Sequence, residues 1–473
     1  MDAMEPDSGM GARNRIDAVT VAINQACDRK GWYTSTAQLQ LASFEFCVAC
    51  RSVSTLHLVI DSEDVAAWLW ADAFSSETPN GNRLGAPRVP ALRPLEVTWK
   101  LPISALSPSA RVFEDVECFT LSDESNGSLD KVVWPRRLQR LFLGDAFNCS
   151  LDSVYWPASL LEVTFSGKDR PAHRSREWGV FNQPIDKVVW PSSLERVSFS
   201  CKFNQPIVNV SWPASLLAIE FGFEFNQGLD EVMWPALLQR LSFGSNFNQP
   251  IDTVSWPASL QQLTFGYNFN QPIDRVSWPA SLQQIFFGWA FNQPIERVSW
   301  PHRYSNSPLE GPLISRSKGY LGQHPCSNSP LEGPSISRSK GVSWPASLQQ
   351  LTLGKYFNQP IERVSWPISL QQITFGYWFD QPINRVSWPA SLQQLTFGMR
   401  FHQPIDMVSW PVSLKELIFG DYFNQPIDTV SWPLSLQQLT FGGCFCQPIH
   451  KISWPMSLQR LAIDGDQRVI AAP

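Results

Sequence analysis

A period of 22 residues runs through most of the chain and constrains its fold more than any other feature. A Trp-Pro pair marks each period, and successive pairs are 22 residues apart except for gaps of 34 before Trp190 and 44 before Trp344. A fixed period of this length is typical of stacked supersecondary units, so we expect a repeat protein. The marking residues are Trp134, Trp156, Trp190, Trp212, Trp234, Trp256, Trp278, Trp300, Trp344, Trp366, Trp388, Trp410, Trp432 and Trp454.

One repeat unit, residues 254–275, predicts the path of a coil. Leu260, Leu263 and Phe265 form the pattern L-x-x-L-x-F, whose alternation is that of a short strand with one buried face. Gly266 ends this strand, and prolines further along keep the return path extended and exclude a helix. A single coil of this kind buries too little apolar surface to fold alone, so neighbouring coils must complete the core. The pattern therefore predicts a solenoid of about sixteen coil positions with one parallel β-sheet of short strands.

The unit W-P-x-S-L-x-x-L-x-F-G-x-x-F-N-Q-P-I resembles the FNIP repeat, a relative of the leucine-rich repeat. The resemblance covers roughly residues 113 to 465, with Trp before Pro where the family usually has Leu or Ile. It implies a leucine-rich-repeat-like solenoid that binds other proteins. Some members of the family carry an N-terminal F-box, which would make the chain a substrate-recruiting subunit of a ubiquitin ligase that contacts a Skp-type linker protein. The opening Leu-Pro and leucine pattern of that motif is absent here.

The sequence also predicts the segments that flank and interrupt the repeats. Residues 1–112 are non-repetitive, and we expect a small, mostly helical cap or adaptor with a strand near residues 55–60. The repeats occupy 113–301 and 342–465, beginning with a degenerate coil at 113–133. The 12 extra residues before Trp190 fall in the polar stretch 166–179, which predicts a surface loop. Residues 466–473 form a tail.

Residues 302–341 lack the repeat pattern but repeat themselves at the same spacing, since Ser305–Pro312 returns at Ser327–Pro334. A shift of one nucleotide explains this, because Ser-Asn-Ser-Pro-Leu-Glu-Gly recodes to Phe-Lys-Leu-Ser-Phe-Gly-Gly and Leu-Gly-Gln to Ser-Trp-Pro. We interpret the segment as two coils translated out of frame, through paired indels or an error in the gene model. We expect it to loop out or pack poorly while the flanking coils dock edge to edge.

Composition narrows the function classes. The net charge of −5 argues against nucleic acid as a partner, and no run of 18 apolar residues predicts a membrane span. Nine scattered Cys and the absence of a signal-peptide core favour a reducing, cytoplasmic location. The six His lack metal spacing, and neither a phosphate loop nor a nucleophile elbow occurs. We therefore predict no catalytic residues, no cofactor and no metal.

Two sets of positions are candidates for function. The two residues after the strand Gly vary most between coils and are often aromatic, which is typical of interface anchors. The strand positions facing solvent form a Gln/Thr ladder with two apolar exceptions, which is a flat docking surface or simply soluble decoration. A third function class, a glycan- or ice-binding Thr surface, would require export. The candidate interaction residues are Tyr267, Trp289, Tyr356, Tyr377, Trp378, Tyr422, Phe286 and Ile418.

Other recurrent residues have a structural interpretation. Stacked Asn amides at one turn are suited to satisfying backbone groups of the next coil. The acidic residues that follow, several of them beside an Arg, read as a solvated charge row rather than a calcium or catalytic site. The sequence thus favours a non-enzymatic protein-interaction scaffold, with the ubiquitin-ligase role as the alternative. The structural ladder includes Asn248, Asn270, Asn292, Asn358, Trp256, Trp278, Trp300 and Trp366.

Overall fold

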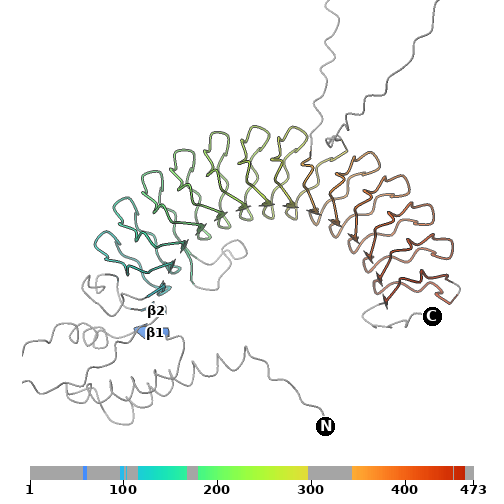
Figure 1. The fold of residues 1–473 in the computed structure, drawn as a ribbon, viewed down its shortest axis with the longest axis horizontal. Helices are drawn as coiled ribbons and strands as arrows, with labels where there is room; N and C mark the ends of the chain where they lie inside the picture. Colours follow the sequence, from blue (N-terminus) through green and yellow to red (C-terminus); the bar gives the residue numbers. More distant parts are fainter. Residues whose placement is uncertain are drawn as a thin grey trace, which may run out of the picture.

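The computed structural model describes residues 57–60, 96–100, 103, 116–167, 179–296, 344–450 and 452–463. Within these residues the chain forms one sheet of 16 parallel strands in sequence order, which is the predicted solenoid (Figure 1). The strands are β1 (His57–Ile60), β2 (Glu96–Trp99), β3 (Cys118–Leu121), β4 (Arg140–Phe142), β5 (Glu162–Thr164), β6 (Arg196–Ser198), β7 (Ala218–Glu220), β8 (Arg240–Ser242), β9 (Gln262–Thr264), β10 (Gln284–Phe286), β11 (Gln350–Thr352), β12 (Gln372–Thr374), β13 (Gln394–Thr396), β14 (Glu416–Ile418), β15 (Gln438–Phe441) and β16 (Arg460–Ile463).

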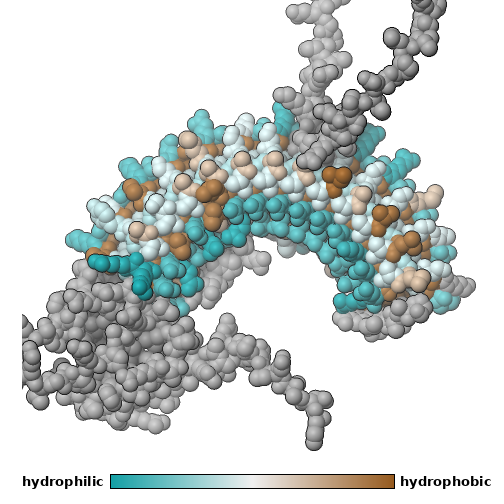
Figure 2. Space-filling view, viewed as in Figure 1, coloured by the Kyte–Doolittle hydropathy of each residue, from teal (hydrophilic) through white to brown (hydrophobic). Residues whose placement is uncertain are grey.

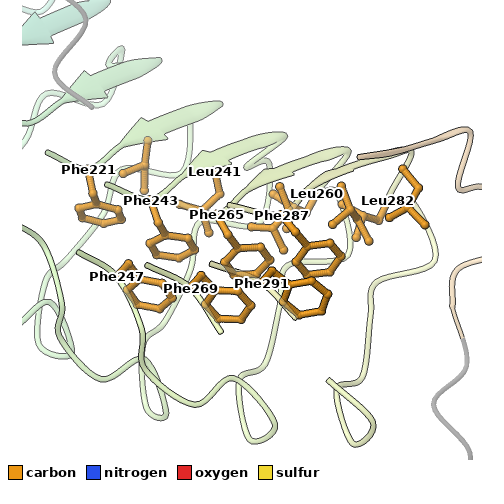
Figure 3. Packing of buried hydrophobic residues seen from close by; sticks show 14 of the residues in the cluster. Phe221, Leu241, Phe243, Phe247, Leu260, Phe265, Phe269, Leu282, Phe287 and Phe291 are labelled. Atoms are coloured by element: carbon orange, nitrogen blue, oxygen red, sulfur yellow. The ribbon is translucent and has the colours of Figure 1, made fainter. Parts of the chain in front are cut away.

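Burial within a coil follows the predicted pattern. The inward positions of the unit are each 8% exposed or less, from Leu260 through to Trp278. Between neighbouring coils the phenylalanines stack in two parallel rows, one after the strand and one after the turn, as Figure 3 shows. Rings of the two rows also contact each other within a coil, with Phe265 and Phe269 centroids 4.0 Å apart. The core is therefore one continuous apolar column shared by all the repeats.

Equivalent groups lie further apart as their distance from the sheet increases, and this curves the solenoid. Neighbouring strands of a sheet are about 4.8 Å apart. The centroids of Phe265 and Phe287, just after the strand, are 5.6 Å apart, and those of Trp256 and Trp278 are 6.5 Å apart. In these coils the core side chains of neighbouring units are therefore further apart than the strands that they follow or precede. The result is an arc with the strands on its concave side (Figure 1).

The strand-end glycines are required by the close approach of successive coils. A Cβ built on Gly266 would lie 1.8 Å from the carbonyl oxygen of Gly244 in the preceding coil. The same clash recurs at Gly222, Gly288 and Gly376, at 1.5 to 1.7 Å. Any side chain at these positions would push neighbouring strands apart. This explains why Gly ends the strand in nearly every unit.

The sheet extends further toward the N-terminus than the predicted start of the repeats at residue 113. β2 pairs with β3 at a step of 22 residues, Glu96 opposite Cys118, and β1 pairs with β2. Val97 and Trp99 of β2 are fully buried in the common core. The strand expected near residues 55–60 coincides with β1, whereas the helices predicted in residues 1–112 lie outside the described residues and stay a prediction.

The two irregular gaps in the period leave the sheet uninterrupted. β5 pairs with β6 across the 12-residue insertion, with Glu162 opposite Arg196. Similarly β10 pairs with β11, with Gln284 opposite Gln350, so the coils on either side of residues 302–341 dock edge to edge as predicted. Residues 297–343 lie outside the described part of the chain. The frame-shift interpretation concerns the coding sequence and stays a prediction.

Candidate protein-interaction site

The turns that follow the strands lie along one edge of the sheet, because all the strands run in the same direction. We call the two positions after the strand-end Gly, in the coils of β9 to β14, the aromatic rim. Five of its aromatic side chains are 40 to 50% exposed, and Tyr377 is half-buried. The exposed five are Tyr267, Trp289, Tyr356, Trp378 and Tyr422.

The first position of the rim forms a continuous row of contacts. The ring centroids of Tyr267 and Trp289 are 5.0 Å apart. The Lys355 ammonium lies 4.3 Å from the centroid of Trp289 and 5.1 Å from that of Tyr377. Lys355 therefore joins two aromatic rings as a shared cation–π partner. The row crosses from the coil of β10 to that of β11, which are 66 residues apart in sequence but adjacent in the sheet.

The second position of the rim repeats this arrangement two coils further along. The Arg400 guanidinium lies 4.5 Å from the centroid of Trp378 and 5.0 Å from that of Tyr422. Tyr377 and Trp378 connect the two rows, with centroids 5.4 Å apart. The sequence identified the aromatic residues but not the cations between them. The structure thus adds Lys355 and Arg400 to the candidate site.

The rim ends in a shallow hollow of about 360 Å³ that is open to solvent. Its walls include Met399 and Asp421 on the rim side and Ile418 on the strand side. In the next coil Gly443 stands where earlier coils carry Tyr, Trp or Lys, so no side chain fills this space. Phe397, Phe419 and Phe441 also line the hollow, so part of its wall is apolar.

The concave face is hydrophilic, as Figure 2 shows. From β9 to β13 each strand consists of a Gln, a buried Leu or Ile, and a Thr, except that β10 has Phe in place of the Thr. The Gln and the Thr face the concave side. Phe286 and Ile418 occupy the Thr position in β10 and β14 and are half-buried. Toward the N-terminus this face is charged instead, and Arg196 and Glu162 form a salt bridge of 3.9 Å. The uncharged ladder is thus confined to the later strands.

The Asn ladder lies in the turn between strand and convex side and bonds each coil to the next. Asn270 donates its backbone N–H to Oδ1 of Asn248 at 2.9 Å, and Asn292 does the same to Asn270. The amide of Gln293 donates to the carbonyl oxygen and to Oδ1 of Asn270. Asn358 bonds to Asn292 at 2.9 Å across the 297–343 gap. These amides are structural, because each satisfies backbone groups of a neighbouring coil.

The Trp ladder is a stack of indoles on the outer side of the core. Trp256 and Trp278 are stacked, and Trp344 takes the next place at 5.6 Å from Trp278. Trp366 continues the series to Trp388 at 6.2 Å, and Trp300 lies outside the described residues. The buried indole N–H groups of Trp256 and Trp278 meet no hydrogen-bond acceptor in the described part of the chain. Their contribution is therefore packing.

The described residues contain no group of three or more His, Cys, Asp or Glu side chains that could hold a metal ion. Burial, with a smaller effect of Asp130, raises the pKa of the Cys149 thiol, which disfavours the nucleophilic thiolate. The hydrogen bond to Glu224 raises the pKa of the exposed Lys202 ammonium. In the same residues no helix has the length and apolar character needed to cross a membrane.

An exposed apolar row at the opposite edge of the sheet was missed from the sequence. It occupies the variable position x of W-P-x-S-L, in the turn before each strand. The sequence signal of this row is a change of residue type. The position is Ala in most earlier coils and carries larger apolar residues toward the C-terminus. We call the row the apolar stripe: Ile368, Ala390, Val412, Leu434 and Met456.

Comparison with known proteins bears on the fold and the family. The model of the FNIP repeat matches residues 181–224, 225–268, 269–303, 340–378, 379–422 and 401–444. The crystal structure of CroV588, described as a novel circular leucine-rich-repeat protein, is 29% identical over 78% of this chain, with a TM-score of 0.55. This chain spans about half of that protein, 52% of its length.

A more distant likeness is to the internalin InlF of Listeria monocytogenes, at 12% identity and a TM-score of 0.40 over 70% of this chain and 81% of that one. No curated protein matches the chain at a comparable level of significance.

Proposed function

Because the chain is an FNIP repeat protein with a leucine-rich-repeat-like solenoid, we propose that it is a non-enzymatic scaffold that binds a partner protein through the aromatic rim. The observation that carries this proposal is the pair of cation–π rows in which Lys355 and Arg400 each lie between two rings. Folding does not require these side chains, since other coils carry Asn, Cys or Ala at the same positions.

The contacts within the rim prepare it for binding. A cation held over a ring restricts the rotamers of both side chains before a partner arrives, so less entropy is lost on association. Aromatic and Arg side chains are also the residues that most often dominate binding energy. The hollow at Gly443 adds a place for one apolar side chain of the partner at the end of the rim. The partner is therefore expected to present an apolar anchor with polar neighbours.

Affinity purification with the full chain tests the proposal. The test variant combines Trp289→Ala, Trp378→Ala and Tyr422→Ala, and the control is Tyr155→Ala, which removes an aromatic side chain that is 83% exposed and far from the rim in sequence. We expect the control to retain its partners and the rim variant to lose at least one. With a purified partner, each central aromatic should contribute about 2 kcal/mol, a loss of affinity of roughly 30-fold.

A further variant separates the rim from the concave face. Thr374→Lys places a charge on the Gln/Thr ladder without touching the rim. Loss of the partners in this variant, together with their retention by the rim variant, would overturn the rim assignment. The ubiquitin-ligase role stays a prediction, and the same experiment tests it, because a Skp-type linker protein should then be among the captured proteins.

A further inference from the structure

The apolar stripe is unusual because its large members are almost fully exposed. Ile368, Val412, Leu434 and Met456 are 80 to 91% exposed, although a folded chain normally buries side chains of this kind. They occupy one position in the last five coils, interrupted only by Ala390. The same position carries Ala, Ser or Arg in every earlier described coil. The stripe therefore belongs to one end of the arc.

The stripe is also shaped to fit itself. A hollow of about 420 Å³ lies beside Ala390, between Trp388 and Val412. If the stripe is reversed about its central residue, Val412 meets Val412, and Ile368 meets Met456. Leu434 then faces Ala390, so the large side chain meets the hollow. The small residue that interrupts the stripe is therefore matched by a large one at the symmetric position.

We propose that the chain forms a two-fold symmetric dimer in which the apolar stripes of two copies pack antiparallel, with Val412 on the axis. Such an isologous contact uses the same patch twice, which is how most homodimers form. If the two-fold axis points along a radius of the arc, the arcs of the two copies share one centre of curvature (Figure 1). The two stripes then curve in the same way and contact each other along their length.

This axis pairs only the last five coils, because the earlier coils of each copy extend past the last described coil of the other. These five coils are the ones that carry the stripe, which explains why the larger residues are absent upstream.

The apolar area of the stripe agrees with the centre of a dimer interface. Burying a large aliphatic side chain removes roughly 100 Å² of apolar surface, so the four exposed members supply about 400 Å² per copy. A standard interface buries about 800 Å² per partner. The stripe thus provides about half of the area, which is the share expected of the apolar centre of an interface. The polar residues around the stripe provide the periphery of the interface.

Sedimentation velocity of the full chain at about 1 to 100 μM tests the proposal, because this range covers the weak end of the affinities found for interfaces of standard area. We expect a concentration-dependent dimer in the wild type and a monomer in Val412→Asp. The matched control is Met407→Glu, which charges another exposed side chain outside the stripe and should leave the dimer intact. Because both positions face solvent, both variants should fold, and circular dichroism checks this.

Two further variants test the packing itself. Ala390→Leu fills the hollow and should weaken the dimer at least tenfold, whereas Ala390→Leu combined with Leu434→Ala exchanges the two sizes and should restore it. Mixing Val412→Asp with Val412→Lys should produce a heterodimer from two monomeric variants. A wild type that stays monomeric at the highest concentration overturns the proposal. A Val412→Asp variant that dimerises as well as Met407→Glu also overturns it. The same holds if the double variant dimerises no more tightly than Ala390→Leu alone.

Discussion

Deleting residues 300–343 should leave the solenoid intact and make it more stable. The deletion joins Ser299 to Trp344 and removes 44 residues, which is twice the 22-residue period. Trp344 already stacks on Trp278, and β10 already pairs with β11. The shortened chain therefore keeps every observed contact and connects the same two coils by the regular path.

The expected gain follows from the entropy of closing the connection. In the wild type 47 residues, 297–343, link Glu296 to Trp344, whereas three remain after the deletion. We expect the segment to loop out, and the two lengths differ by about four doublings, each of which costs about 0.6 kcal/mol in a loop. The deletion should therefore stabilise the folded state by about 2 kcal/mol.

Urea unfolding followed by circular dichroism measures this change as a higher midpoint with little change in slope. The control deletes residues 300–342, which leaves one extra residue and forces the junction out of register. We expect this control to be less stable than the in-register deletion. A lower midpoint for the in-register deletion than for the wild type would refute the reasoning, because it would mean that the removed segment stabilises the sheet.

Three smaller predictions test the contacts between coils. Gly266→Ala should lower the free energy of unfolding by more than about 3 kcal/mol, since its Cβ would overlap the preceding carbonyl oxygen, while Gly228→Ala, with nothing within 4 Å, should cost little in the same urea titration. Asn270→Ala should cost about 1 kcal/mol, because two partly buried donors of the next coil lose their acceptor, and the exposed Asn268→Ala serves as its control. Lys202→Met should lower the urea midpoint slightly at neutral pH. Since the folded-state pKa of Lys202 is raised above 10.5, this difference should vanish as the pH rises through that pKa.

Most of the fold could be predicted because the repeat places equivalent residues in equivalent surroundings. Leu263, Phe265 and Phe269 are buried in the unit and recur in the same roles throughout, so one correctly interpreted coil determines the others. The start of the sheet was missed because residues 1–112 lack both the Trp-Pro pair and the Leu-Asp turn that marks the degenerate coil at Leu129-Asp130. A signal was present nevertheless, since Val97 and Trp99 precede Phe119 and Leu121 by 22 residues.

The candidate site could be predicted only in part. The aromatic residues of the rim are visible in the repeat, but the contact between Trp289 and Lys355 depends on whether residues 302–341 occupy two coil positions or none. The sequence predicts that the flanking coils dock edge to edge, but not that the Lys355 ammonium lies over the Trp289 ring. Pairing of β10 with β11 brings Trp289 and Lys355 together, and with them the first row of the rim.

Contacts between neighbouring coils distinguish the residues that folding requires from the residues that are available for function. Strand-end Gly, ladder Asn and core Phe are each required by a contact with the preceding coil, so their recurrence needs no functional explanation. The rim positions and the stripe positions project from turns at opposite edges of the sheet, and folding tolerates Asn, Cys, Ala or Ser there. Clusters of aromatic residues at one edge and of large aliphatic residues at the other are therefore not consequences of the repeat. Since the two edges cannot be covered by one flat partner, we expect substitutions on the stripe to change self-association without changing capture of a partner by the rim.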